Sequence, residues 1–462
     1  MAITVSGIGS GIDTASLVSQ LVNAERQPAE LRFNTKEAGL QSELSSFGTL
    51  SSALSQFQES VQKLNDITLF QARTASSSNE DIFSVSATST AVSGSYELEV
   101  TQLAAAEKLR SGDFASETDT VGTGTLDISL GTDTFQVTID TDNSSLAGVR
   151  DAINSASDNP GISAAIINVD DGVGGTISRL VLTSEETGSA NTIDVVAVDD
   201  DAGDGFDLTQ LNTANLTTIR AAQDAIIELD GQTATRSSNS LSDVISGITI
   251  DLNTAEIGTV ETLTIALDRD SVKTNVVNFV AAYNNLADTV TSLGAYDAAS
   301  GAAGGLQGDS TLRNVENQIR AALTTGIEGL AFGTLAEIGV TTESTGKLAI
   351  DTDKLDSVID TDFNAVAQLF SSENGLATTL DDIIERYTSA DGSLSAQTAN
   401  IQERINGLDD DRARLDDRIA SLEARLQAQF VALDGLVASL QSIGSFLTQQ
   451  LANLPKPNSI GN

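Results

Sequence analysis

The chain has 462 residues, which is long enough for three or four compact domains. Its 65 acidic and 24 basic side chains give a formal charge of -41, so its surface repels phosphate backbones and we expect no nucleic-acid partner. It contains no His, Cys or Trp, which excludes Ser-His-Asp triads, cysteine nucleophiles, disulfides and zinc sites built on thiolate or imidazole.

The opening "MAITVSGIGSG" lacks the basic start and the continuous apolar core of a secretory signal, so we expect another export route if the chain leaves the cell. Its "GIGSG" is no dinucleotide fingerprint, because Ile12 stands where the third Gly of G-x-G-x-x-G belongs. We interpret the glycines as a hinge before a helix that is capped by Asp13 or Thr14. The apolar face of that helix consists of Leu17, Val18, Leu21 and Val22.

A second apolar stripe repeats in steps of three and four across "LQSELSSFGTLSSALSQFQESVQKL" and predicts a helix. Its members are Leu40, Leu44, Phe47, Leu50, Leu54, Phe57, Val61 and Leu64. From about Ser76 to Asp270 the pattern changes to short alternating strands broken by Gly, Asp, Asn and Ser, such as "GSYELEVTQL" and "DTFQVTID". We expect two small β-rich domains there, one inserted in the other.

Helical periodicity returns from Ser271 and continues after "GLQGD", where Asp309 is the expected N-cap. That second helix has an apolar face that includes Leu312, Val315 and Ile319. The stretch "IGVTTESTGKLAIDTDKL" predicts a hairpin with Gly346 at its turn and Asp351 at the start of the next helix.

The end of the chain carries the clearest periodicity, a heptad seam that predicts one long helix. Its members are Ile401, Ile405, Leu408, Leu415, Ile419, Leu422, Leu426, Leu433, Leu436, Leu440, Ile443 and Leu447. The simplest geometry pairs this helix antiparallel with the front stripe, although a helix inside a globular bundle is the alternative. No unbroken apolar run reaches roughly 18 residues, so we expect no membrane insertion.

Acidic clusters offer no metal or catalytic site. The run "VDDDAGDGFD" lacks the spacing and the twelfth-position Glu of a calcium loop, and "VDDGVGG" is typical of a hairpin connection. No carboxylate pair is marked for acid and base roles. We therefore predict no enzyme, no cofactor and no metal.

Several motifs together resemble the bacterial flagellar filament-capping family, which is a family of hook-associated proteins. They are "GIGSGIDTASLVSQLVNAERQP" at the start, "DGQTATRSSNSLSDVISGITIDL", "NFVAAYNNLADTVTSLGAYD", "GGLQGDSTLRNVENQIR" and "LAEIGVTTESTGKLAIDTDKL". In addition, "AGVRDAINSASDNPGISAAIIN" with "RLVLTSEETGSANTI" is similar to a small module of flagellin and hook proteins.

The resemblance implies a secreted, non-enzymatic protein at the distal tip of the flagellar filament. It implies a homo-oligomeric ring of five or six subunits that promotes flagellin insertion and prevents flagellin loss. Further implied partners are hook-filament junction proteins, a type III export chaperone and host mucin or glycan. The rival interpretations are another flagellar axial or hook-junction component and an extracellular adhesin.

The predicted fold class is α+β, with a helical coiled-coil stalk formed by both chain ends and two nested β-rich head domains. The boundaries are a terminal segment at 1–30, a stalk at 31–75 with 271–430, one head at 76–110 with 220–270, a second head at 111–219, and a terminal helix at 431–462 that pairs with the amino-terminal segment.

The predicted sites fall into three sets. The coiled coil of the stalk is expected to use Leu44, Phe47, Leu54, Val61, Ile405, Leu408, Leu415, Ile419, Leu422 and Leu426. Stalk-to-stalk contacts in the oligomer are assigned to Leu312, Val315 and Ile319. Assembly and filament contacts are assigned to Ile12, Leu17, Val18, Leu21, Val22, Leu436, Leu440, Ile443 and Leu447.

Overall fold

The computed structural model describes residues 13–200, 205–299 and 301–453. The chain divides into two compact units, a helical unit of Met1–Ile67 with Ser271–Asn462 and a β-rich unit of Thr68–Asp270. This division agrees with the predicted α+β class, in which an inserted β-rich region interrupts a helical region. The finer boundaries within each unit stay predictions.

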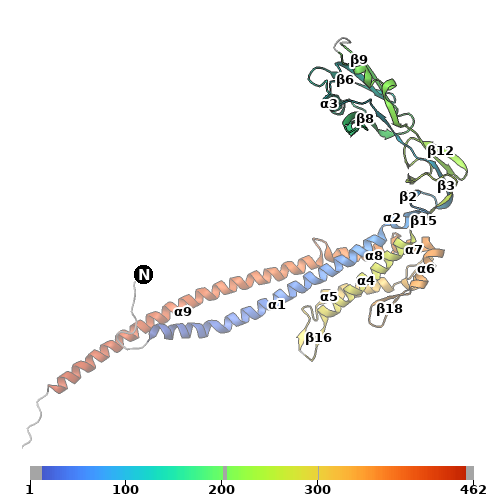
Figure 1. Cartoon of the computed structure of the whole chain (residues 1–462). Coiled ribbons are helices and arrows are strands. Elements are labelled where there is room, and N and C mark those ends of the chain that lie inside the picture. The colour runs from blue at the N-terminus through green and yellow to red at the C-terminus, as the bar shows by residue number, and fades with distance from the viewer. Residues whose placement is uncertain (1–12, 201–204, 300, 454–462) are drawn as a thin grey trace, which may run out of the picture. The chain divides into compact units, whose positions relative to one another are not determined.

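Two long helices dominate the helical unit and lie side by side (Figure 1). They are α1 (Thr14–Asn65) and α9 (Ser393–Ala452). Their direction is antiparallel, because Glu43 pairs with Arg404 whereas Glu25, nearer the start of the chain, pairs with Arg418, nearer its end. The predicted antiparallel pairing of the two chain ends is therefore confirmed.

Shorter helices complete a bundle around the second half of α1. They are α4 (Arg269–Gly294), α5 (Ser310–Thr324), α6 (Thr352–Thr361), α7 (Phe363–Ser371) and α8 (Leu376–Thr388). A short 3-10 helix, η3 (Leu335–Ile338), and two hairpins join them. The hairpin strands are β16 (Tyr296–Asp297), β17 (Ala302–Ala303), β18 (Val340–Thr342) and β19 (Leu348–Ile350).

Aromatic side chains fill the centre of this bundle. The Phe57 ring of α1 lies 5.5 Å from Phe279 and 5.8 Å from Tyr283 of α4, centroid to centroid. Phe279 in turn contacts Phe370 of α7 edge-on at 6.0 Å. The hydroxyl of Tyr283 donates to the Gly346 carbonyl, and burial raises the pKa of that hydroxyl. Packed aromatic pairs stabilise a core beyond the area that they bury.

The helix caps follow the sequence expectations. Asp13 is the N-cap of α1, and its carboxylate accepts a hydrogen bond from the Ser16 backbone N–H. Asp309 caps α5 and Asp351 caps α6 in the same way. Gly346 has a φ of 85° at the turn between β18 and β19, a conformation that favours glycine. These predictions are confirmed.

The β-rich unit contains two apolar clusters, each formed by its own strands. One cluster uses two sheets whose strand orders are β1-β15-β3-β11-β12 and β13-β14-β2. The strands are β1 (Arg73–Ser77), β2 (Phe83–Ala87), β3 (Gly94–Gln102), β11 (Ala225–Leu229), β12 (Gln232–Arg236), β13 (Ser240–Leu241), β14 (Ile248–Leu252) and β15 (Glu261–Leu267). Helix α2 (Ile67–Gln71) precedes β1.

The second cluster draws on residues between Leu109 and Leu216. Its sheets have the orders β10-β4-β8-β7 and β6-β5-β9. The elements are β4 (Ala106–Arg110), β5 (Gly124–Leu130), β6 (Asp133–Ile139), α3 (Leu146–Ser155), β7 (Ile162–Asp170), β8 (Thr176–Thr187), β9 (Ile193–Asp199), η1 (Leu208–Leu211), η2 (Thr213–Asn215) and β10 (Thr217–Arg220). In sequence, the second cluster lies between two parts of the first cluster. The second β-rich domain is therefore an insertion in the chain of the first.

Candidate assembly surfaces

The α1–α9 pair is held by a thin apolar seam with charged pairs on its flanks. Val18, Val22 and Ala29 of α1 bury their side chains against Leu415 and Ile419 of α9. Phe33, Leu426 and Phe430 pack on this cluster. On the flanks Arg26 pairs with Asp416, and Arg412 pairs with Glu37 and Asp409. Glu37 holds the pKa of the Arg412 guanidinium above its ordinary value, mainly by a hydrogen bond.

This contact corrects one sequence expectation. The terminal helix at 431–462 was expected to pair with the amino-terminal segment, but Val18 and Val22, which are only 3% and 7% exposed, pack against Leu415 and Ile419 earlier in α9. Leu17 and Leu21 remain exposed on the adjacent face of the helix. The expected boundary near residue 30 falls inside a helix, because α1 continues through Pro28 without a break. Packing of Ala29 against α9 stabilises the helix there, although proline removes one helix hydrogen bond.

The seam of α9 is buried in its first half and exposed toward its carboxyl end. Ile405, Leu408, Leu415 and Ile419 are buried, and Leu422 and Leu426 are half-buried. The last four predicted positions are more than half exposed, with Leu436 at 62%, Leu440 at 59%, Ile443 at 52% and Leu447 at 54%. The cause is the register of the two antiparallel helices. Arg418 of α9 lies beside Glu25 of α1, and α1 begins only eleven residues before Glu25, at Thr14. The structure therefore leaves Val431–Ala452 without a neighbour from α1.

The exposed end of α9 is also apolar in composition. The helical stretch Phe363–Ala452 contains an 18-residue window with a mean hydropathy of 1.5, none of it buried, that by length and composition could cross a membrane. The sequence predicts no membrane insertion, because no unbroken apolar run reaches roughly 18 residues. Mean hydropathy tolerates single polar residues, and by that criterion one candidate stretch is present. Polar side chains interrupt this part of the helix, among them Gln441, Ser445 and Thr448. A one-sided apolar seam is typical of contact with another helix.

Two other predicted sets occupy different places from those expected. Leu312, Val315 and Ile319 are buried inside the bundle, so their assignment to contacts between stalks is wrong. An amphipathic helix turns its apolar face toward its own core first. Val61 is buried as well, but at the level of α8, because Gln58 and Gln62 both donate to Asp381 there. It therefore belongs to the bundle core and not to the pair with α9.

The other stalk positions lie along α1 near the start of α9. Phe47 and Leu54 are fully buried, and Leu44 is half-buried. Ile12 falls outside the described residues.

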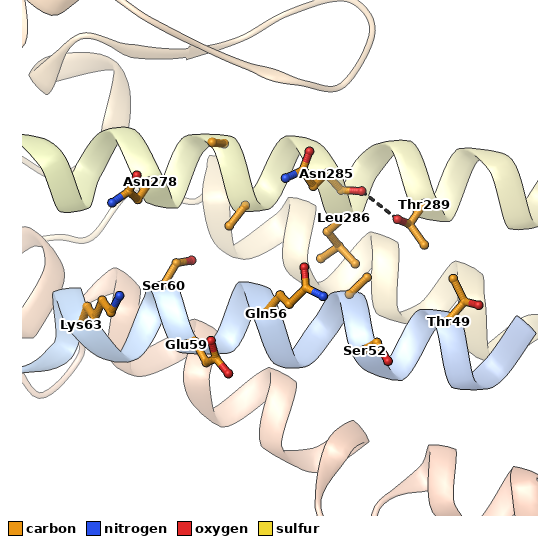
Figure 2. A pocket seen from close by; sticks show the side chains of 13 residues that line it. Thr49, Ser52, Gln56, Glu59, Ser60, Lys63, Asn278, Asn285, Leu286 and Thr289 are labelled. Carbon is orange, nitrogen blue, oxygen red and sulfur yellow. Dashed lines mark hydrogen bonds between the residues drawn. The ribbon is translucent and has the colours of Figure 1, made fainter.

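A groove that the sequence did not indicate runs between α1 and α4 (Figure 2). Its volume is about 450 Å³. Figure 2 shows that the helices are antiparallel here, with Lys63 beside Asn278 at one end and Thr49 beside Thr289 at the other. Small and amide side chains line most of it, namely Thr49, Ser52, Ala53, Gln56, Ser60, Asn278, Ala281, Ala282, Asn285 and Thr289, together with Leu286, Glu59 and Lys63.

The groove was not predicted from the sequence, because its lining residues are mostly small or polar and form no apolar stripe. Residues such as Ser52, Gln56 and Asn285 look like an ordinary solvated helix face in the sequence. Among the described residues, no group of three or more acidic side chains is arranged to hold a metal ion.

Family models match most of the chain. The model described as "Flagellar hook-associated protein 2 C-terminus" matches residues 222–442, and the one described as "Flagellar hook-associated protein 2 N-terminus" matches residues 10–107. A third, described as "Flagellin hook IN motif", matches residues 125–186. That range covers most of the segment whose motifs are similar to a module of flagellin and hook proteins.

Relatives that match over nearly their whole length belong to the same family as these models. The chain is 36% identical to the B-type flagellar hook-associated protein 2 of Pseudomonas aeruginosa over 469 residues, which is 97% of each chain. It is 35% identical to flagellar hook-associated protein 2 of Escherichia coli K12 over 98% of each chain. The chain belongs to the flagellar hook-associated protein 2 family.

A solved structure supports the same family. The D1-D2-D3 domains of the flagellar cap protein FliD from Escherichia coli match with a TM-score of 0.62 and 34% identity, over 77% of this chain and 99% of that one. The resemblance predicted from the motifs is confirmed. The family assignment also disfavours the adhesin as the primary role.

Proposed function

We propose that this hook-associated protein caps the distal end of the flagellar filament as an oligomeric ring. In this role it promotes the insertion of flagellin and prevents flagellin from being lost to the medium. The observation that carries the proposal is the exposed apolar seam at the end of α9, where eight large apolar side chains lie on a helix without α1 beside it. Exposed apolar patches of this kind usually mark protein contacts.

The exposed seam can be buried only by contact with another protein chain or with a further segment of the same assembly. Each large apolar side chain that becomes buried contributes roughly 1.5–3 kcal/mol, so the exposed seam can supply a strong contact. We assign this contact to flagellin or to terminal segments of neighbouring copies. Leu17 and Leu21 of α1 are exposed as well and extend the same proposal. Nothing in this role requires a catalytic group, and we assign a structural, non-enzymatic function.

Finer aspects of the proposal rest on the family resemblance. They are the ring of five or six copies, secretion through the flagellar export channel, and contacts with junction proteins, an export chaperone and host mucin or glycan. A chain without cysteine can pass through such a channel unfolded without disulfides to reduce. We also propose that the exposed α9 seam contacts protein and does not insert into a membrane.

A single substitution tests the seam. Leu440→Asp places a carboxylate in the middle of the exposed apolar face, where burial in a contact would cost several kcal/mol. We expect cells with this variant to export the protein normally but to shed flagellin into the medium and to swim poorly. The measurement is flagellin in culture supernatants, together with filament length by electron microscopy.

The neighbouring residue supplies a matched control. Ser439→Asp adds the same charge to the same helix at an exposed polar position, and we expect normal filaments. Normal filaments in the Leu440→Asp strain would show that this seam does not anchor the cap. Equal leakage from both variants would indicate a general charge effect.

A further inference from the structure

The groove between α1 and α4 has features of a protein contact. Gln56, Asn278 and Asn285 expose their amide groups along it, and in the described part of the chain these side chains have no hydrogen-bond partner. Figure 2 shows Gln56 and Leu286 in the space between the two helices. Small lining residues such as Ala53 and Ala282 allow another helix to approach closely.

Charge favours an approach of identical copies at this groove. Each copy carries a formal charge of -41, so two copies repel each other over most of their surface. The middle of the groove carries no charged side chain, and Glu59 and Lys63 at one end offset each other. Like-charged subunits can meet only where acidic groups are absent or compensated.

The same unit offers a helix face of matching character. The exposed side of α5 carries Arg313, Asn314, Asn317 and Ala321, with no acidic side chain among them. In the described residues neither asparagine has a hydrogen-bond partner, and Arg313 has no ion pair. The stretch from Arg313 to Ala321 is about 12 Å long at 1.5 Å per residue, and the α4 side of the groove, residues 278–289, is about 16 Å long.

The two surfaces lie at the same level of the bundle but on different flanks of α4, and Leu286 lies where these flanks meet. Val315 and Ile319 of α5 face Leu286 and Val290 of α4, which places Asn317 level with the groove. However, the groove opens on the side of α4 that faces α1. A contact between two unlike surfaces is heterologous, and its repetition forms a ring when the rotation between successive copies closes.

We propose that the α1–α4 groove receives the exposed face of α5 from a neighbouring copy of this chain. This proposal rests on the proposed function, because it names the contact that joins the subunits of the cap ring. Asn314 and Asn317 exchange hydrogen bonds with the amides of the groove, and Ala321 lies against its small residues. The buried face of α5 keeps its place in the bundle.

The absence of cysteine allows a direct test by disulfide trapping. The full-length double variant Ser52→Cys/Asn317→Cys places one thiol in the groove and one on α5, both at exposed positions. Disulfides form only where the two Cα atoms come within about 7 Å. Under mild oxidation we expect a ladder of dimers, trimers and larger species up to a closed ring, because each copy carries both halves of the contact.

The controls separate the possible geometries. Each single variant should stay monomeric on non-reducing gels, and so should Asn317→Cys/Ala399→Cys, whose second thiol lies on the exposed face of α9. Dimers from either single variant would indicate a symmetric contact and overturn the proposal. Cross-links to added flagellin in place of the ladder would assign the groove to flagellin and also overturn it.

A groove-filling variant gives a second measurement. Ala281→Trp occupies the groove from an exposed position, and we expect it to weaken self-association at least tenfold in analytical ultracentrifugation. Ala399→Trp is the matched control and should associate normally. If Ala281→Trp associates normally and the cysteine pair gives no ladder, the proposed contact is wrong. The proposed cap function is not affected by that result. A wild-type chain that stays monomeric at high concentration contradicts the ring itself.

Discussion

The two units handle apolar surface and charge differently. In the β-rich unit, exposed apolar side chains are scattered over loops, as at Val92 and Ile257, and over strands, as at Val196 of β9, whereas the helical unit gathers eight of them at one end of α9. The β-rich unit also holds 33 of the 65 acidic but only 8 of the 24 basic side chains. The difference makes the end of α9 the largest run of exposed apolar side chains among the described residues, and it gives the β-rich unit the more negative surface.

The strand edges of the β-rich unit show how it avoids contacts. Asn154 of α3 donates to the Ala164 carbonyl and accepts from the Ala164 N–H at the outer edge of β7. Asn212 and Thr213 likewise accept hydrogen bonds from Ala197 and Val195 of edge strand β9. Edge groups that already have a hydrogen-bond partner are less available to pair with another strand. The helical unit has no such protection along the end of α9.

The largest effect on stability is expected in the aromatic centre of the helical unit. Phe57→Ala leaves a cavity beside Phe279 and Tyr283 and should lower the free energy of unfolding of this unit by about 3–5 kcal/mol. Denaturant unfolding followed by helical circular dichroism measures it. Hydrogen exchange should show an unchanged β-rich unit. Val277→Ala on the exposed side of α4 should stay within about 0.5 kcal/mol, and equal losses would contradict the assignment of the core.

A smaller effect is expected at the edge of β7. Asn154→Leu removes both hydrogen bonds to Ala164 and should cost about 1–3 kcal/mol. It should also expose the strand edge, so the variant should scatter light at concentrations where the wild type does not. Ser163→Ala, at an exposed position of the same strand, is the control. If Asn154→Leu neither loses stability nor aggregates, edge protection does not distinguish the two units.

The sequence predicted the elements that are marked by a local pattern, such as a repeat of apolar residues or a single capping or turn residue. The seam of α9, the caps Asp13 and Asp309 and the turn at Gly346 all depend on local pattern, and all are present. The partner of Val18 was missed, because it depends on the register between helices that lie nearly 400 residues apart in sequence. The α1–α4 groove was missed because a polar, small-residue lining has no periodic signal.

The ion pairs beside the α1–α9 seam should contribute less than the cores. Arg412→Gln removes the bonds to Glu37, Asp409 and Asn34 and should lower stability only slightly at low salt, since the charged groups are partly solvated. Faster hydrogen exchange in α1 around Glu37 should accompany the loss. Both differences should shrink at 1 M salt, where screening is strong. A salt-independent effect would mean that Arg412 acts through packing of its stem.

The smallest effect concerns the Glu337 carboxylate in the first turn of η3. It accepts hydrogen bonds from the backbone N–H groups of Gly333 and Thr334, and these bonds hold its pKa below the ordinary value. A lowered pKa in the folded state means that the carboxylate contributes stability fully at neutral pH. The contribution disappears as the pH falls through the folded-state pKa. Glu337→Gln keeps the shape but not the charge, so wild type and variant should differ slightly at pH 7 and converge at low pH. Chemical unfolding at a series of pH values measures this convergence, and a difference that grows toward acid would contradict the assigned role of the charge.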